Sequence, residues 1–91
     1  MKPSEILQRA KDSLTEKTWG QGFRCYRPEH TLCALEALGT LDNWDSPAFD
    51  LFRSAIGTES VTQWNDAPER TLAEVHAAFD KAIAAAKEAG Q

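Results

Sequence analysis

Apolar residues recur at helical spacing in four segments of the chain, and no segment shows the strict alternation of a half-buried strand. The pattern therefore predicts an all-α fold, a compact bundle of about four helices. Glycines follow the apolar segments and can adopt the left-handed conformation that ends a helix. The expected helices cover residues 3–19, 28–38, 46–56 and 71–89, ended by Gly20, Gly39, Gly57 and Gly90.

Two of these helices carry clear start signals. Ser46 precedes Pro47, so a capping hydroxyl is followed by a proline in the first turn, where its missing N–H is not needed. Thr71 and Glu74 have the spacing of a capping box, in which each side chain accepts a hydrogen bond from the other's backbone N–H. These signals fix the third and fourth helices more firmly than the first two.

Aromatic residues lie just outside the predicted long helices. Val61 and Trp64 are expected on a short helical turn, and residues 65–68 form a turn before the last helix. Trp19, Trp44 and Trp64 can each close an end of a small core while the indole N–H reaches a polar partner. We interpret these tryptophans as structural residues.

Length and composition limit the possible classes. The 91 residues, 42% hydrophobic and 26% charged, suit one soluble helical domain over residues 1–91. The apolar runs are too short for a transmembrane helix, and the first residues lack the apolar stretch of a secretory signal. We therefore expect a cytoplasmic protein without membrane contact.

Charge is divided unevenly along the chain. Residues 1–28 carry six Lys/Arg against three Asp/Glu, a net charge of +3, and residues 29–91 carry four against eleven, a net of −7; together these give −4. An acidic chain is repelled by phosphate backbones, so we do not expect a general nucleic-acid binder. The basic first third leaves a local nucleic-acid contact open.

Metal-ligating and nucleophilic residues are present without a favourable spacing. Cys25, His30 and Cys33, with His76 as a fourth ligand, are the only zinc candidates, and they match none of the paired patterns of zinc sites. Cys33 lies in an apolar run, which opposes thiolate formation. The acidic residues 42–45 lack the alternating ligands of a calcium loop. We predict free thiols, no cofactor and no enzymatic activity.

A glycine-containing loop combines aromatic and cationic side chains, a mixture suited to anchoring a protein interface or stacking on bases. The same side chains are also suited to folding back onto the core or pairing with acidic residues of the helices. The candidate partner-binding residues are Gln21, Phe23, Arg24, Tyr26, Arg27 and Arg70.

Three motifs stand out: Trp19-Gly20-Gln21-Gly22, the segment from Cys33 to Leu38, and the segment from Trp64 to Val75. Together they resemble a family of small uncharacterised proteins from actinobacteria and their bacteriophages. Glu36 departs from the glycine expected at that place. The resemblance implies an actinobacterial or phage setting and no particular reaction. The recurring residues look like scaffold: Trp19, Trp64, Asn65, Asp66, Thr71 and Glu74.

These observations favour a non-enzymatic protein–protein interaction module. If the protein is phage-encoded, its expected role is to bind and modulate a host protein. Two alternatives stay open: a nucleic-acid contact through residues 21–27 and the first helix, and a small zinc or thiol protein.

Overall fold

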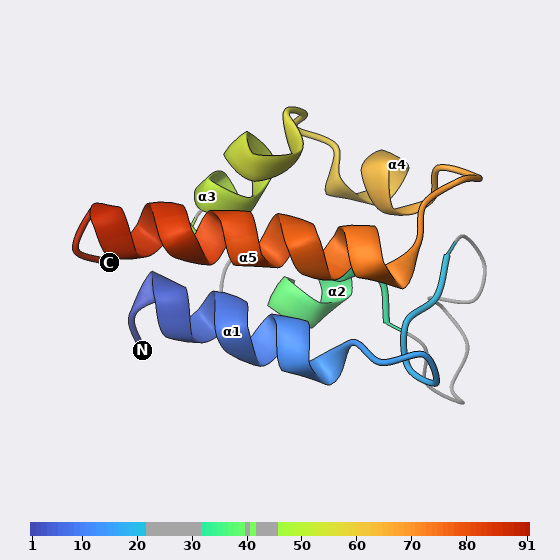
Figure 1. Cartoon of the computed structure of the whole chain (residues 1–91), viewed down its shortest axis with the longest axis horizontal. Coiled ribbons are helices and arrows are strands. Elements are labelled where there is room, and N and C mark those ends of the chain that lie inside the picture. The colour runs from blue at the N-terminus through green and yellow to red at the C-terminus, as the bar shows by residue number, and fades with distance from the viewer. Residues whose placement is uncertain (22–31, 40, 42–45) are drawn as a thin grey trace.

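The computed structural model describes residues 1–21, 32–39, 41 and 46–91, and helices make up most of this part of the chain (Figure 1). The predicted all-α class is confirmed. The described residues contain one isolated β-bridge, between Trp19 and Leu32. The helices are α1 (Pro3–Ser13), α2 (Ala34–Gly39), α3 (Pro47–Ile56), α4 (Val61–Asn65) and α5 (Leu72–Glu88).

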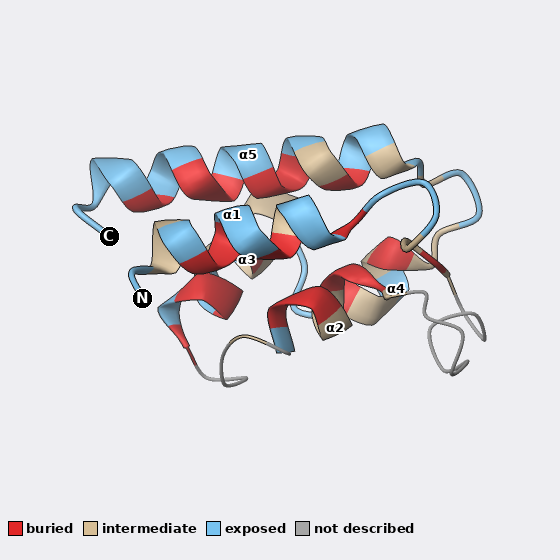
Figure 2. Cartoon of the chain, turned by 90° about the horizontal axis from the view of Figure 1, so that it is seen from below, coloured by how far each residue is buried: buried red, intermediate tan, exposed pale blue. Residues whose placement is uncertain are grey.

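The long helix α5 packs against both α1 and α3, and these two helices also contact each other (Figure 1). The buried residues of these helices face one another, while their outer sides are exposed (Figure 2). Because the burial of apolar surface is the dominant favourable term in folding, this three-helix contact forms the main core. Its largest fully buried side chains are Phe49, Phe52, Phe79, Leu7 and Leu14.

The first helix is shorter than predicted, and its expected extension to Trp19 is wrong. Helix α1 ends at Ser13. The Thr18 hydroxyl donates to the Ser13 carbonyl at 2.7 Å and accepts from the Thr15 N–H at 2.8 Å. Threonine side chains that bond to nearby backbone groups offer an alternative to the helix. Gly20 is accordingly a buried residue beyond a turn and does not end a helix.

The second helix also begins later than predicted. Within the expected range, residues 28–31 lie outside the described residues, and Leu32 and Cys33 are not helical. Leu32 pairs with Trp19 instead. The Cys33 sulfur accepts a hydrogen bond from the Glu36 N–H at 3.4 Å, so this residue precedes α2 in the place of a cap. Helix α2 therefore covers only Ala34–Gly39.

Helix α3 starts and ends as its sequence predicts. Its N-cap is Ser46, whose hydroxyl accepts from the Phe49 N–H at 3.4 Å, and Pro47 occupies the first turn. Gly57 follows the helix with φ of 75°, the left-handed conformation that favours glycine.

Helix α5 has the predicted capping box at Thr71 and Glu74. At its other end Gly90 has φ of 75°. The Gly90 N–H bonds to the Lys87 carbonyl at 3.1 Å, and the Gln91 N–H bonds to the Ala86 carbonyl at 2.7 Å. This pair of bonds is a Schellman motif, which satisfies carbonyls that the helix leaves unpaired.

The short helical turn predicted around Val61 and Trp64 is present as α4. It packs mainly against α2, at the end of the molecule away from both chain termini (Figure 1). None of the helices in the described ranges combines the length and apolar character of a transmembrane span.

Candidate functional site

A buried asparagine organises the end of the molecule where α2 and α4 meet. Asn65, the last residue of α4, has no solvent-exposed surface. Its side-chain oxygen accepts from the Trp19 indole N–H at 2.8 Å and from the Ala34 backbone N–H at 3.1 Å. Its side-chain nitrogen donates to the Gly20 carbonyl at 3.0 Å and to the Asp66 carboxylate at 3.0 Å.

An amide group offers two acceptor positions and two donor hydrogens, and Asn65 uses all four. Such a group is costly to bury unless it is satisfied, and stabilising once it is. The described residues accordingly contain no buried side-chain nitrogen or oxygen without a partner. We call Trp19, Gly20, Gln21, Ala34 and Asn65 the Asn65 cluster.

Within this cluster, Gln21 bonds to backbone carbonyls and not to the Asn65 side chain. Its side-chain nitrogen donates to the Asn65 carbonyl and to the Ala67 carbonyl, both at 2.8 Å. Because a Gln side-chain nitrogen carries two hydrogens, both bonds can form together. They hold the chain after Trp19 against the turn that follows α4.

The cluster brings together two stretches that are separated in sequence by residues 22–31. The Gly20 N–H donates to the Leu32 carbonyl at 3.0 Å, and the Leu32 N–H donates to the Thr18 carbonyl. These two bonds form the parallel bridge between Trp19 and Leu32. Residues 22–31 therefore leave from and return to one hydrogen-bonded base.

Arg70 lies against this base and does not extend outward. Its guanidinium stacks over the Trp64 ring, with the central carbon 4.1 Å from the ring centroid, and its Nε donates to the Trp64 carbonyl at 2.9 Å. Its other partner is Glu74, at 3.3 Å. The side chain is 20% exposed. Stacking and bonding together make Arg70 a support for Trp64, whose ring also meets the Phe52 ring edge-on at 5.8 Å.

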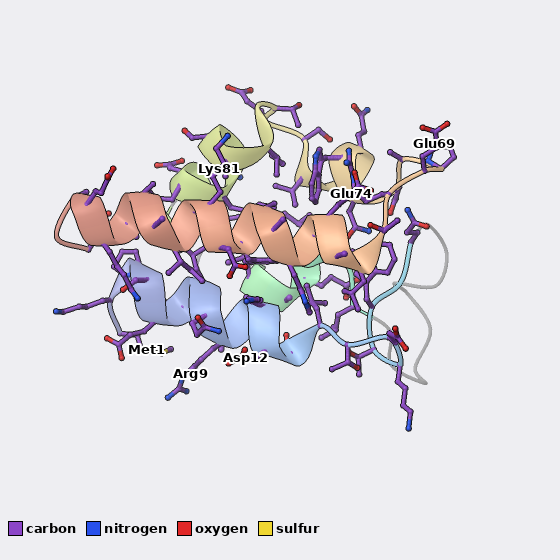
Figure 3. All side chains as sticks on the ribbon, in the orientation of Figure 1. Met1, Arg9, Asp12, Glu69, Glu74 and Lys81 are labelled. Atoms are coloured by element: carbon purple, nitrogen blue, oxygen red, sulfur yellow. The ribbon has the colours of Figure 1, made fainter. Side chains whose placement is uncertain are left out.

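The capping box shifts the ionisation of Glu74. The Thr71 backbone N–H donates to the Glu74 carboxylate at 2.9 Å and holds the pKa of Glu74 below its ordinary value of 4.5, partly opposed by desolvation. The Thr71 hydroxyl and the charge of Arg70 lower this pKa further. Figure 3 shows Glu74 on the side of α5 that faces α4, so the capping box lies next to Arg70 and Trp64.

Two of the zinc candidates are described, and both have other partners. His76 Nε2 donates to the Leu14 carbonyl at 2.6 Å, which joins α5 to the end of α1. Cys33 is buried, and its sulfur lies 3.7 Å from a Glu36 carboxylate oxygen. Cys25 and His30 lie outside the described residues. In the described part of the chain, no three His, Cys, Asp or Glu side chains are grouped as a metal site.

A surface hollow of about 440 Å³ lies elsewhere, at the C-terminal end of α3. Its lining includes Arg53 with the acidic Asp50 and Glu59, and it shares no residue with the Asn65 cluster. Arg53 and Asp50 pair with each other at 3.4 Å. The hollow therefore presents a mixed charge without a histidine or cysteine.

The predicted partner-binding residues divide into two groups. Gln21 and Arg70 are described: Gln21 bonds to the Asn65 and Ala67 carbonyls, and Arg70 contacts Trp64 and Glu74. Phe23, Arg24, Tyr26 and Arg27 belong to residues 22–31 and lie outside the described residues, as do Trp44 and the acidic residues 42–45.

Sequence reasoning missed the part played by Gly20, Leu32 and Ala34, which contribute backbone groups and no distinctive side chain. It placed Trp19 and Asn65 in the scaffold but did not connect them. The available signal was Asn65 itself, which directly follows Trp64 on a short helical turn. An asparagine needs hydrogen-bond partners when it is buried.

Comparison with known families gives one match. A model described as a family of unknown function (DUF6197) matches residues 1–85. No curated protein and no solved structure matches the chain.

Proposed function

The chain belongs to this family of unknown function, and from that premise we propose that it is a non-enzymatic protein-binding module that presents residues 22–31 to a protein partner. Binding residues often lie on loops that a rigid scaffold positions. The observation that supports the proposal is the hydrogen-bonded base beneath this segment: the Asn65 cluster and the Trp19–Leu32 bridge hold its two ends side by side.

The composition of the segment supports the same proposal. It contains Phe23, Arg24, Tyr26 and Arg27, and aromatic residues and arginine are enriched in protein interfaces. The two described residues of the predicted binding set, Gln21 and Arg70, already bond to groups within the chain. We therefore propose that residues 22–31 contact the partner, and that the Asn65 cluster and the Trp19–Leu32 bridge position these residues.

The setting proposed for this activity is the cytoplasm of an actinobacterium, with the chain encoded by the host or by a bacteriophage. In the phage case, the partner is a host protein whose activity the module modulates. A partner with acidic groups beside apolar surface fits the two arginines and two aromatic rings.

The test is affinity capture from nuclease-treated lysate, followed by binding of the purified, identified partner to the purified chain. We expect Arg24→Ala/Tyr26→Ala/Arg27→Ala to weaken binding at least tenfold, since interface arginines and tyrosines often contribute 2 kcal/mol or more, on the order of a 30-fold change in affinity. The melting temperature should change little, because arginines that serve a binding face contribute little to the stability of the fold.

The matched control is Lys81→Ala/Lys87→Ala, which also removes two positive charges but from exposed positions of α5. Figure 3 shows Lys81 on the side of the molecule opposite Arg9 and Asp12 of α1. This control should bind like the wild type. Equal losses in both variants would indicate an effect of net charge and contradict a specific interface.

A nucleic-acid contact through residues 21–27 and α1 is the second candidate, favoured by the net charge of +3 on residues 1–28. Binding of this kind falls steeply with salt, and Arg9→Ala would weaken it, since Arg9 is exposed on α1. Capture that is lost with nuclease and high salt would favour this alternative. Stoichiometric zinc in the purified protein, lost on Cys25→Ser/Cys33→Ser, would instead favour a metal protein.

A further inference from the structure

We propose that the exposed face of α5 pairs with the same face of a second copy of this chain, with the two helices antiparallel and a two-fold axis at Ala84. The proposal goes beyond the proposed function and does not depend on residues 22–31. It rests on the placement of charged side chains along a helix face that the rest of the chain leaves open.

Helix α5 buries one side only. Its buried residues face α1 and α3, and its opposite side is exposed along the length of the helix (Figure 2). Ala77 and Ala84 lie in the middle of that exposed side, about two turns apart. Their small side chains allow a second helix to approach closely, because the distance between helix axes depends on the side chains at the contact.

Four charged residues flank the two alanines, as two pairs with seven-residue spacing. Asp80 and Lys87 lie on the side of α1, since Asp80 bonds to Lys11 at 2.7 Å and Lys87 lines a hollow with residues of α1. Lys81 lies on the other side of α5, toward α3 (Figure 3), and Glu88 follows it by about two turns on that side. Each side of the exposed face therefore carries one acid and one base.

These charges are not placed to pair within α5. Ion pairs on one helix form between residues three or four apart, whereas a seven-residue spacing separates two residues by about 10.5 Å along the axis. No residue of opposite charge stands three or four positions from Lys81, Lys87 or Glu88. Within the described part of the chain, none of these three forms an ion pair. Opposite charges for them are available only from outside the helix.

A two-fold axis at Ala84 supplies those charges. It sets each residue of α5 opposite the one equally far beyond Ala84 in the second copy, and it keeps the α1 sides of the two copies together. Asp80 stands four residues before Ala84 and Lys87 three after it, so each Asp80 meets Lys87 of the second copy. Lys81 and Glu88 stand three before and four after, and they meet in the same way.

The charge pattern also selects the antiparallel order. Parallel helices would set Asp80 against Asp80 and Lys81 against Lys81, which is repulsive. Asp80 is available for the antiparallel contact, because one of its two carboxylate oxygens bonds to Lys11 and its side chain is still 58% exposed. The face is therefore complementary to itself.

The expected dimer is weak. A contact over about three turns of helix is smaller than the roughly 1,200–2,000 Å² of a stable interface. We expect a dissociation constant on the order of 0.1 mM at low salt. Salt should weaken the dimer further, because exposed ion pairs are screened.

Charge reversal followed by mixing tests the proposal in sedimentation equilibrium. Lys81→Glu alone and Glu88→Lys alone should each weaken the dimer at least about tenfold, because two ion pairs become two like-charge contacts. An equimolar mixture of the two variants should associate with about the affinity of the wild type. In the mixed dimer the two reversed side chains meet each other, and the two unchanged ones meet each other.

The matched control is Lys17→Glu, which makes the same charge change at an exposed position outside α5 and should dimerise like the wild type. Wild type that stays monomeric up to about 1 mM would overturn the proposal. A mixture as weakly associated as its two components would overturn it too, as would a dimer that neither variant weakens.

These outcomes are separate from the test of partner binding. At micromolar concentrations the chain should be monomeric, so Lys81→Ala/Lys87→Ala serves there as the control for binding through residues 22–31. Absence of the dimer would leave the proposed function intact.

Discussion

One apolar core runs through this small protein, and the end where α2 and α4 meet adds a buried hydrogen-bond network to it. At the end that contains the chain termini, α1, α3 and α5 bury Phe49, Phe52 and Phe79 completely. At the other end, the fully buried Asn65 joins α4 to both flanks of residues 22–31 through hydrogen bonds. The aromatic rings there, Trp19 and Trp64, are only partly buried.

This difference suggests two tasks: one region stabilises the fold, and the other holds the two ends of residues 22–31 in place. Apolar burial is non-directional and grows with the area removed from water, so it suits a core that must be stable. Hydrogen bonds depend on angle and distance, so they suit a base that must hold two chain ends in one geometry. Phe52 connects the two ends, since its ring packs against two others. The ring centroids are 4.4 Å apart for Phe79 and 5.8 Å apart for Trp64.

The largest effect is expected in the apolar core. Phe79→Ala should lower the free energy of unfolding by about 3–5 kcal/mol, because it removes a fully buried ring and leaves a cavity. Denaturant unfolding measures this loss, with Phe79→Leu as the milder control. A loss below 1 kcal/mol would contradict the assignment of stability to the three-helix core.

The next effect is expected at the polar end. Asn65→Ala should cost about 2–4 kcal/mol, because it removes the acceptor of the Trp19 indole N–H and of the Ala34 N–H and the amide that donates to the Gly20 carbonyl. Gln63→Ala, an exposed position of the same helix, should change stability by less than about 0.5 kcal/mol. If both variants unfold at the same denaturant concentration, the comparison between the two ends fails.

A smaller and local effect is expected at the start of α5. Thr71→Ala should cost about 1 kcal/mol, because the Thr71 hydroxyl accepts the Glu74 N–H at 3.2 Å. Thr71→Ser retains the hydroxyl and should unfold close to the wild type. An unchanged midpoint for Thr71→Ala would show that the cap contributes nothing once α5 is packed.

The smallest effect depends on pH. Since folding lowers the pKa of Glu74, its carboxylate stabilises the folded chain above the unfolded value of 4.5. This contribution is lost as the pH falls through the lower folded pKa. The wild type should therefore melt above Glu74→Gln at pH 7, and the difference should vanish toward pH 2. A difference that grows in acid would reverse the assigned sign.

Local signals in the sequence were sufficient for the helices that carry them. Ser46 before Pro47 and the pair Thr71 and Glu74 predict the starts of α3 and α5, because a cap involves neighbours only three residues apart. Periodicity alone was not sufficient for α1. Apolar spacing continues past Ser13, but the hydroxyl of Thr18 ends the helix through local bonds that periodicity does not register.

The candidate site was predicted residue by residue and not as an arrangement. Trp19 and Asn65 were both expected in the scaffold, yet their bond joins residues 46 positions apart. Arg70 was expected to bind Asp66 or to face a partner, and its stacking on Trp64 was not foreseen. A single sequence does not specify which distant backbone groups an asparagine meets, since those groups have no side-chain identity.

The most direct test of the hydrogen-bonded base is solvent exchange of the Trp19 indole N–H, followed by NMR and assigned through Trp19→Phe. A bond of 2.8 Å from this N–H to the buried Asn65 predicts slow exchange in the wild type and rapid exchange in Asn65→Asp. Rapid exchange in the wild type, at the rate of a free indole, would show that Asn65 does not hold this end of the segment.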